Sequence, residues 1–129
     1  MVKKMKVLLI DDDADFVEMC KLALENADFD VEFAYDGQQG LEKAREVMPD
    51  AIVLDVMMPE KDGFKACEEL RQDPKISDIP VLMLTAVGQH FSTSRYSRGS
   101  GLTLDFEDYL DKPVEPEELV KRVRSLIPR

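Results

Sequence analysis

Several residue types are scarce in this chain, and each scarcity narrows what the protein can be. The 129 residues contain no tryptophan, one histidine and two cysteines. Cys20 and Cys67 fall within helical patterns and show no Cys-x-x-Cys spacing, so we expect buried, reduced thiols in a cytoplasmic protein. His90 lies in a stretch rich in serine and glycine, where we expect a solvated loop residue and not a phosphohistidine.

Basic residues and long apolar runs are also in short supply. The chain has 17 lysines and arginines against 27 acidic residues, a formal net charge of −10. This balance argues against direct nucleic-acid binding and against docking on an anionic membrane. The apolar run in "MVKKMKVLLI" is too short for the core of a signal peptide, and nothing approaches a membrane span. We therefore predict a cytoplasmic protein without membrane insertion.

What the chain does contain is an alternation of short aliphatic runs and longer amphipathic patterns. Its length suits one domain with a single core. The predicted strands cover 6–10, 31–35, 51–55, 81–85 and, more weakly, 107–111. The predicted helices cover 14–27, 38–48, 62–72 and 115–127. Continuous aliphatic strands are buried on both faces, so the pattern predicts an α/β fold with a parallel sheet.

The polar residues of greatest interest follow the predicted strands. They are Asp11 and Asp12 after the first, Asp55 at the end of the third, Thr85 at the end of the fourth and Lys112 after the fifth. Right-handed crossovers bring the carboxyl ends of parallel strands to one edge of the sheet. Crowded carboxylates need a hard divalent cation, so we expect Mg²⁺ or Mn²⁺ among them. Asp13 and Asp15 instead favour the positive end of the first helix.

The same residues suit phosphoryl transfer. An ionised aspartate can attack phosphorus directly, and a metal ion, an ammonium and a hydroxyl can neutralise the oxygens of the transferred group. The edge of the sheet therefore has the composition of a phosphate acceptor.

Four motifs carry a family resemblance: "LLIDDDADF", "AIVLDVMMPEKDGF", "PVLMLTA" and "DYLDKP". In this order they resemble the signatures of response-regulator receiver domains. These domains belong to two-component signal transduction and are similar to the chemotaxis regulator. The resemblance spans nearly the whole chain and implies a single receiver domain over residues 1–129. It also implies a flavodoxin-like (βα)5 doubly wound sheet with strand order 2-1-3-4-5.

The resemblance assigns roles to the acidic residues. Asp55 resembles the phosphoacceptor. Asp12 resembles the direct Mg²⁺ ligand, and Asp11 the acidic partner that acts more often through water. The backbone carbonyl of Met57 resembles the third protein ligand.

It also assigns the switch residues. Thr85 resembles the hydroxyl that moves to bond the phosphoryl group, and Lys112 the lysine that pairs with it. Tyr109 resembles the aromatic residue that turns inward afterwards. The Lys112–Pro113 peptide bond is expected to be cis.

The chain departs from the family pattern between Thr85 and Lys112, which lie 27 positions apart. This spacing is longer than usual, and "LDFED" replaces the small Gly-Ala pair before the last strand. We predict that 86–106, the fourth-helix region, is atypical and mobile or remodelled. In the family that the chain resembles, two positions tune the lifetime of the phosphorylated state, and here they would be Met57 and Val87. Both are apolar and cannot orient a water molecule, so we predict slow autodephosphorylation.

The resulting hypothesis is a signalling receiver and not an enzyme, although it assists its own phosphorylation and dephosphorylation. It would take a phosphoryl group from a histidine kinase or a histidine phosphotransfer protein and control an unidentified output, as a stand-alone regulator or part of a longer one. Two alternatives remain. One is a phosphorylation-independent interaction module on the same fold. The other is an aspartate-nucleophile phosphohydrolase of the haloacid-dehalogenase type, which would need a small Gly-Thr or Gly-Val pair that "DDDADF" lacks.

Overall fold

The computed structural model describes residues 4–56, 63–85 and 106–127. Its strands are β1 (Lys6–Ile10), β2 (Asp30–Ala34), β3 (Ala51–Asp55), β4 (Val81–Thr85) and β5 (Asp108–Asp111). Its helices are α1 (Ala14–Asn26), α2 (Gly37–Val47), α3 (Gly63–Gln72) and α4 (Pro116–Leu126). Every predicted element is present, with each end within one residue of its expected position. The predicted fourth-helix region, 86–106, lies outside the described residues except for Phe106.

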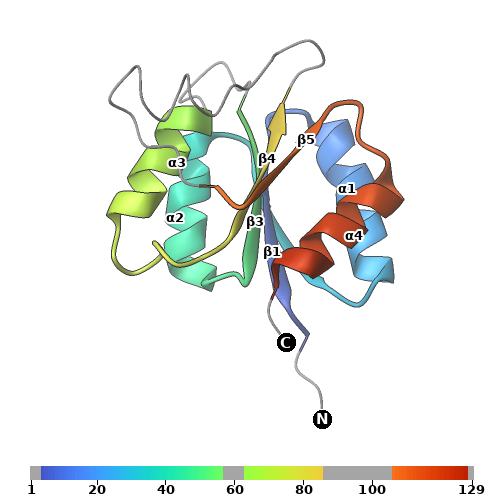
Figure 1. Ribbon diagram of the computed structural model, residues 1–129, viewed down its shortest axis with the longest axis horizontal. Coiled ribbons are helices and arrows are strands. Elements are labelled where there is room, and N and C mark those ends of the chain that lie inside the picture. The colour runs from blue at the N-terminus through green and yellow to red at the C-terminus, as the bar shows by residue number, and fades with distance from the viewer. Residues whose placement is uncertain (1–3, 57–62, 86–105, 128–129) are drawn as a thin grey trace.

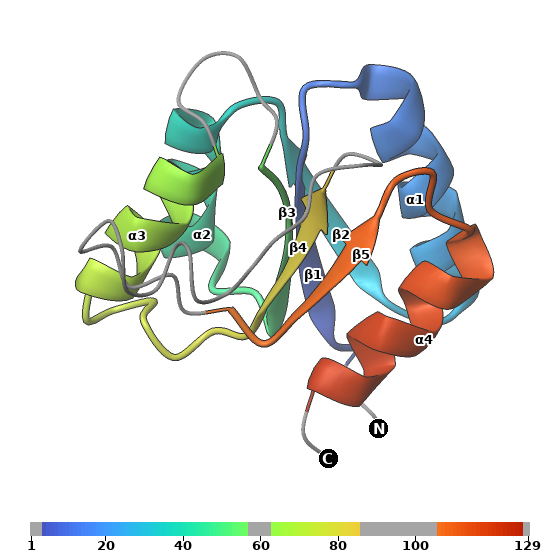
Figure 2. The ribbon, with the colours of Figure 1, turned by 45° about the horizontal axis from the view of Figure 1, so that its top comes forward.

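The five strands form one parallel sheet in the order β2-β1-β3-β4-β5. Helices α2 and α3 cover one face, and α1 and α4 cover the other (Figure 1). Figure 2 shows the strands side by side, with β5 at the edge nearest the viewer. This is the flavodoxin-like doubly wound α/β architecture, so the predicted fold class is confirmed.

The core is divided by the sheet into two apolar layers. All five residues of β3 and of β4 are buried, which explains why their sequences are aliphatic without alternation. Ile52, Leu54 and Met83 pack toward α2 and α3, whereas Val53, Leu82 and Leu84 pack toward α1 and α4. A slip of one residue in register would therefore move each of these side chains into the opposite layer, whose packing it does not fit.

The helices begin where the sequence provides caps. Asp13 accepts a hydrogen bond from the Phe16 backbone N–H, and Asp36 accepts one from that of Gln39. Gly40 lets α2 lie directly on β1, because a Cβ atom there would come within 2.5 Å of the Ile10 side chain. Among the described residues, no helix combines the length and the apolar character needed to cross a bilayer.

Both cysteines are buried and unbridged, as the sequence predicted. Burial, reinforced by the nearby Asp11 carboxylate, raises the pKa of the Cys20 thiol to about 12. These thiols are packing residues of the two core layers.

Phe106 and Glu107 form an anchor at the start of β5. The Glu107 carboxylate accepts hydrogen bonds from the Val81 backbone N–H at 2.6 Å and from the Arg71 guanidinium at 2.7 Å. Arg71 also donates to the carbonyl oxygens of Ser77 and Ile79, at 2.8 and 2.7 Å. Phe106 packs on the core layer beneath α2 and α3. Phe106 and Glu107 thus tie β5 to the end of α3 and to the start of β4.

This anchor predicts a stability effect. Glu107→Ala removes the acceptor of the Val81 N–H and one of the acceptors of the Arg71 guanidinium, and should lower the free energy of unfolding by about 1–2 kcal/mol. Urea denaturation followed by circular dichroism measures the change. Glu46→Gln is the control, because the Glu46 side chain is exposed and its ion pair with Lys43 should contribute little. Equal effects of the two substitutions would contradict a structural role for Glu107.

Candidate functional site

Three polar residues are buried at the carboxyl ends of adjacent strands. Asp11 follows β1, Asp55 ends β3 and Thr85 ends β4. Each of these residues is at most 2% exposed. Buried carboxylates are costly unless they are paired or bind a cation. The strand ends therefore hold negative charge that must be compensated locally.

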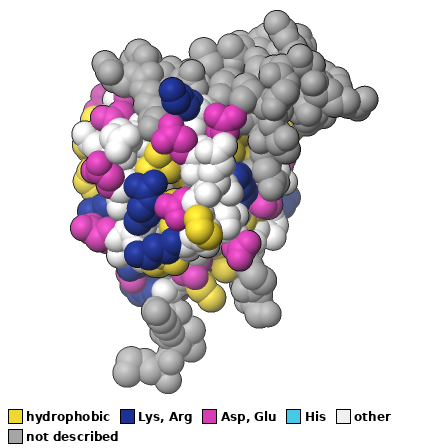
Figure 3. All heavy atoms as spheres, turned by 90° about the vertical axis from the view of Figure 1, so that its left-hand side faces the viewer, with side chains coloured by type: hydrophobic (Ala, Val, Ile, Leu, Met, Phe, Trp, Pro, Cys, Tyr) yellow, Lys and Arg dark blue, Asp and Glu magenta, His cyan; other side chains and the backbone are white. Residues whose placement is uncertain are grey.

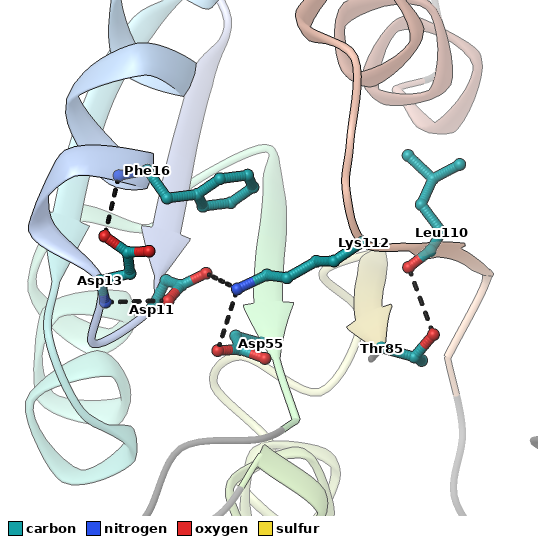
Figure 4. A network of polar contacts seen from close by, with 7 residues as sticks. All are labelled: Asp11, Asp13, Phe16, Asp55, Thr85, Leu110 and Lys112. Atoms are coloured by element: carbon teal, nitrogen blue, oxygen red, sulfur yellow. Dashed lines mark hydrogen bonds and ion pairs between the residues drawn. The ribbon is translucent and has the colours of Figure 1, made fainter. Parts of the chain in front are cut away.

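Lys112 provides this compensation. Its Nζ atom lies 2.9 Å from Asp11 Oδ2 and 3.4 Å from Asp55 Oδ2, so one ammonium bridges both carboxylates (Figure 4). The same atom lies 4.5 Å from the centre of the Phe16 ring, within the range of a cation–π contact. The ammonium is thus fixed between the ends of β1 and β3 by two ion pairs and an aromatic face.

The acidic residues form a candidate metal site. Asp11, Asp12 and Asp55 each place one carboxylate oxygen within 4.8 Å of the others. Opposite ligands of octahedral Mg²⁺ are about 4.2 Å apart, because each Mg–O bond is about 2.1 Å. A hard, all-oxygen donor set of this size fits Mg²⁺ or Mn²⁺ with water completing the coordination. Asp12 is exposed, so the site opens to solvent.

The roles of the neighbouring aspartates differ. Asp11 Oδ1 accepts the Asp13 backbone N–H at 3.0 Å, and Asp11 Oδ2 accepts Lys112. Asp13 caps α1, and Asp15 lies in the first turn of that helix. Neither belongs to the three-carboxylate group. The positive end of α1 therefore accounts for Asp13 and Asp15, as the sequence predicted.

Burial and charge shift two pKa values in this site. Burial raises the pKa of the Asp11 carboxyl, and the negative charge of Asp55 adds to that rise. The Asp13 N–H and Lys112 oppose the rise only in part. Burial alone would lower the pKa of Lys112, but the hydrogen bond and charge of Asp11, together with Asp55, raise it. The lysine therefore remains cationic at neutral pH, as an anion site requires.

The two predicted switch residues lie on neighbouring strands. The Thr85 side chain is directed toward β5 and not toward Asp55 (Figure 4). Tyr109 is 42% exposed, and its ring meets Phe106 edge-on with a centroid distance of 6.3 Å. In this conformation the hydroxyl is turned away from the predicted acceptor and the aromatic ring is turned toward solvent.

Three residues near the site were not singled out from the sequence. Gly63 begins α3 against the acceptor strand, since a Cβ atom there would come within 2.4 Å of the Asp55 carbonyl oxygen and Val56 Cα. The sequence feature that could have indicated Gly63 is the "DGF" motif after β3. Phe16, which faces Lys112, carried no signal because its helical position is typical of a core residue. Asp111 contacts Thr85, and the strand register pairs these residues.

Other predictions have mixed outcomes. The Lys112–Pro113 peptide bond is cis, as expected. Met57, Val87 and His90 lie outside the described residues, so the predicted carbonyl ligand and the lifetime positions remain predictions.

Comparison with known proteins decides the family. The model of the response regulator receiver domain matches residues 7–124. The chain belongs to this family. It is therefore a receiver domain of two-component signalling.

Relatives and solved structures agree with this assignment. The chain is 43% identical over 124 residues to the DNA-binding dual master transcriptional regulator RpaA of Synechocystis sp., covering 96% of this chain and 49% of that protein. It is 40% identical to the alkaline phosphatase synthesis transcriptional regulatory protein PhoP of Bacillus subtilis, with the same coverage.

The structure of the chemotaxis protein CheY4 of Vibrio cholerae matches with a TM-score of 0.82 and 30% identity, covering 97% of this receiver domain and all of CheY4. The receiver domain of the Francisella response regulator 1452 matches with a TM-score of 0.78 and 33% identity, covering 95% and 96% of the two chains. The chain spans about half the length of the curated relatives named here, but the full length of CheY4.

Proposed function

We propose that this receiver domain accepts a phosphoryl group on Asp55 from the phosphohistidine of a histidine kinase or a histidine phosphotransfer protein. The observation that supports this most strongly is the single Lys112 ammonium that bridges Asp11 and Asp55 at the carboxyl ends of two parallel strands. A cation held there by carboxylates is placed to pair with an anion that becomes attached to one of them.

The transfer exchanges one phosphorus bond for another. An Asp55 carboxylate oxygen attacks phosphorus, the phosphorus–nitrogen bond to the histidine breaks, and the imidazole leaves with the bonding electron pair and takes a proton from solvent water. An acyl phosphate remains on Asp55. Asp12 and Asp55 would hold a divalent cation, with Asp11 acting through water and the Met57 carbonyl as a further ligand, and the cation would supply positive charge for the phosphoryl oxygens. Lys112 then exchanges its contact with Asp55 for one with the phosphoryl group.

The acyl phosphate would act as a switch. Thr85 would turn so that its hydroxyl donates a hydrogen bond to a phosphoryl oxygen. Tyr109 would then move inward from its half-exposed position into the space that Thr85 leaves. The phosphoryl group therefore favours one of two arrangements of β4 and β5 through contacts that exist only in that arrangement. The domain would control its output in this way and not by turning over a substrate.

The names of the relatives indicate the kind of output and no individual partner. RpaA is named a DNA-binding transcriptional regulator, and this chain matches about half of it. We infer that the receiver domain itself makes no direct contact with nucleic acid. On the face formed by α2 and α3, acidic and basic side chains are interspersed (Figure 3). Two residues of α2 form ion pairs, Lys43 with Glu32 and Arg45 with Asp73. A nucleic-acid surface needs a basic patch instead.

Phosphoryl uptake tests the proposal directly. Incubation with acetyl phosphate and Mg²⁺ should add one phosphoryl group, detected by intact mass, and the addition should require the metal. Asp55→Asn should abolish it, because the amide cannot act as the nucleophile. Lys112→Ala should reduce its rate by about tenfold or more, since a charge-assisted contact to the phosphoryl oxygens is lost.

Asp15→Asn is the matched control, because it removes an exposed carboxylate from the first turn of α1 and should leave uptake unchanged. If the parent protein gained no phosphoryl group, or if Asp55→Asn retained it, phosphotransfer to Asp55 would be ruled out. The phosphorylation-independent interaction module would then be the better reading.

The lifetime of the phosphorylated state provides a separate prediction. Because Met57 and Val87 are apolar and cannot orient water for attack on phosphorus, we expect a half-life of minutes or longer. Met57→Asn should shorten it, because an amide can hold an attacking water molecule. Loss of the added mass after removal of acetyl phosphate measures the half-life. A half-life of seconds that Met57→Asn leaves unchanged would contradict the prediction.

A further inference from the structure

We propose that Asp111 is a positioning residue that holds the Thr85 hydroxyl away from Asp55 until a phosphoryl group competes for it. The inference rests on the proposed function of Asp55 and Thr85 and adds a residue that opposes the switch. The Thr85 hydroxyl donates to Asp111 Oδ1 at 2.5 Å, with the Leu110 carbonyl oxygen a more distant acceptor at 3.5 Å.

The contact is a consequence of the sheet register. Thr85 and Asp111 are partners in the parallel pairing of β4 with β5, so their side chains emerge side by side on the same face. The main chain reinforces this alignment, because the Lys112 N–H donates to the Thr85 carbonyl oxygen at 2.7 Å. Any hydrogen-bond acceptor at position 111 therefore meets the hydroxyl. A carboxylate accepts more strongly than a neutral side chain would.

The hydroxyl cannot serve two acceptors equally. A threonine side chain has a single O–H donor, so its proton bonds either Asp111 or a phosphoryl oxygen on Asp55. Thr85 is 1% exposed, so water cannot readily replace the acceptor that it gives up. The Thr85–Asp111 hydrogen bond exists only in the resting arrangement, so its free energy favours that arrangement over the switched one.

The Thr85–Asp111 hydrogen bond lies close in the sheet to Tyr109, the predicted aromatic switch. Tyr109 precedes Asp111 by two residues in β5 and lies on the same face of the sheet, beside Met83 of β4. Asp111 therefore lies beside the Thr85 hydroxyl and on the same strand face as Tyr109. Asp111 would set how far the unphosphorylated domain populates the switched arrangement.

A double-mutant cycle separates this role from simple charge repulsion. Beryllofluoride with Mg²⁺, a phosphoryl analogue that binds carboxylate oxygens, is titrated and followed by ¹H–¹⁵N NMR. Asp111→Ala should tighten beryllofluoride binding by about fivefold when Thr85 is present, because the hydroxyl no longer has to leave a charged acceptor. In a Thr85→Ala background the same substitution should change the affinity by less than about twofold.

Asp111→Asn provides the matched variant, because it removes the charge and keeps an acceptor oxygen, and its affinity should lie between those of the parent and Asp111→Ala. An equal effect of Asp111→Ala in both backgrounds would show that only charge repulsion is involved and would overturn the proposal. No effect in the Thr85 background would overturn it as well.

A second readout does not depend on phosphoryl chemistry. In the untreated protein, the hydrogen-bonded Thr85 hydroxyl proton should exchange slowly enough to be seen by NMR, and Asp111→Ala should remove that signal. Absence of the signal in the parent protein would overturn the proposal. A parent that shows this signal but binds no beryllofluoride would instead contradict the proposed function of Asp55.

Discussion

The ion pairs of Lys112 with Asp11 and Asp55 are the interaction on which the rest of the site depends. Two buried carboxylates at the ends of adjacent strands repel each other and lose hydration, and one ammonium offsets both effects. This arrangement is stable in the resting protein, and it can respond to added charge. A divalent cation adds positive charge, and a phosphoryl group on Asp55 adds negative charge for Lys112 to bind.

The scaffold fixes the positions of these charges closely. Asp13 ties the start of α1 to Asp11 and caps the helix. Gly63 lets α3 begin against the backbone of Asp55. The Glu107–Arg71 anchor determines where β5 starts, and hence where Asp111 and Lys112 emerge at its other end. Residues far from the predicted chemistry therefore determine how the carboxylates, the hydroxyl and the ammonium face one another.

Much of this could be predicted from the sequence because the signals were strong and local. Aliphatic runs marked β3 and β4, and polar residues at strand ends marked the site. The elements agreed with expectation to within one residue. Asp111 was missed because its meaning depends on the register of β4 against β5, which periodicity alone does not supply. Gly63 and Phe16 were missed because close approach of backbone atoms and an aromatic face beside an ammonium are tertiary features.

An anomalous difference map from crystals grown with Mn²⁺ tests the metal site most directly. One strong peak is expected at the carboxyl ends of β1 and β3, in contact with side-chain oxygens of Asp12 and Asp55. Asp55 would keep its second carboxylate oxygen near Lys112. A metal peak elsewhere, or Asp12 and Asp55 turned apart with no shared ion, would contradict the claim that this edge of the sheet is built to hold a dication and an incoming anion.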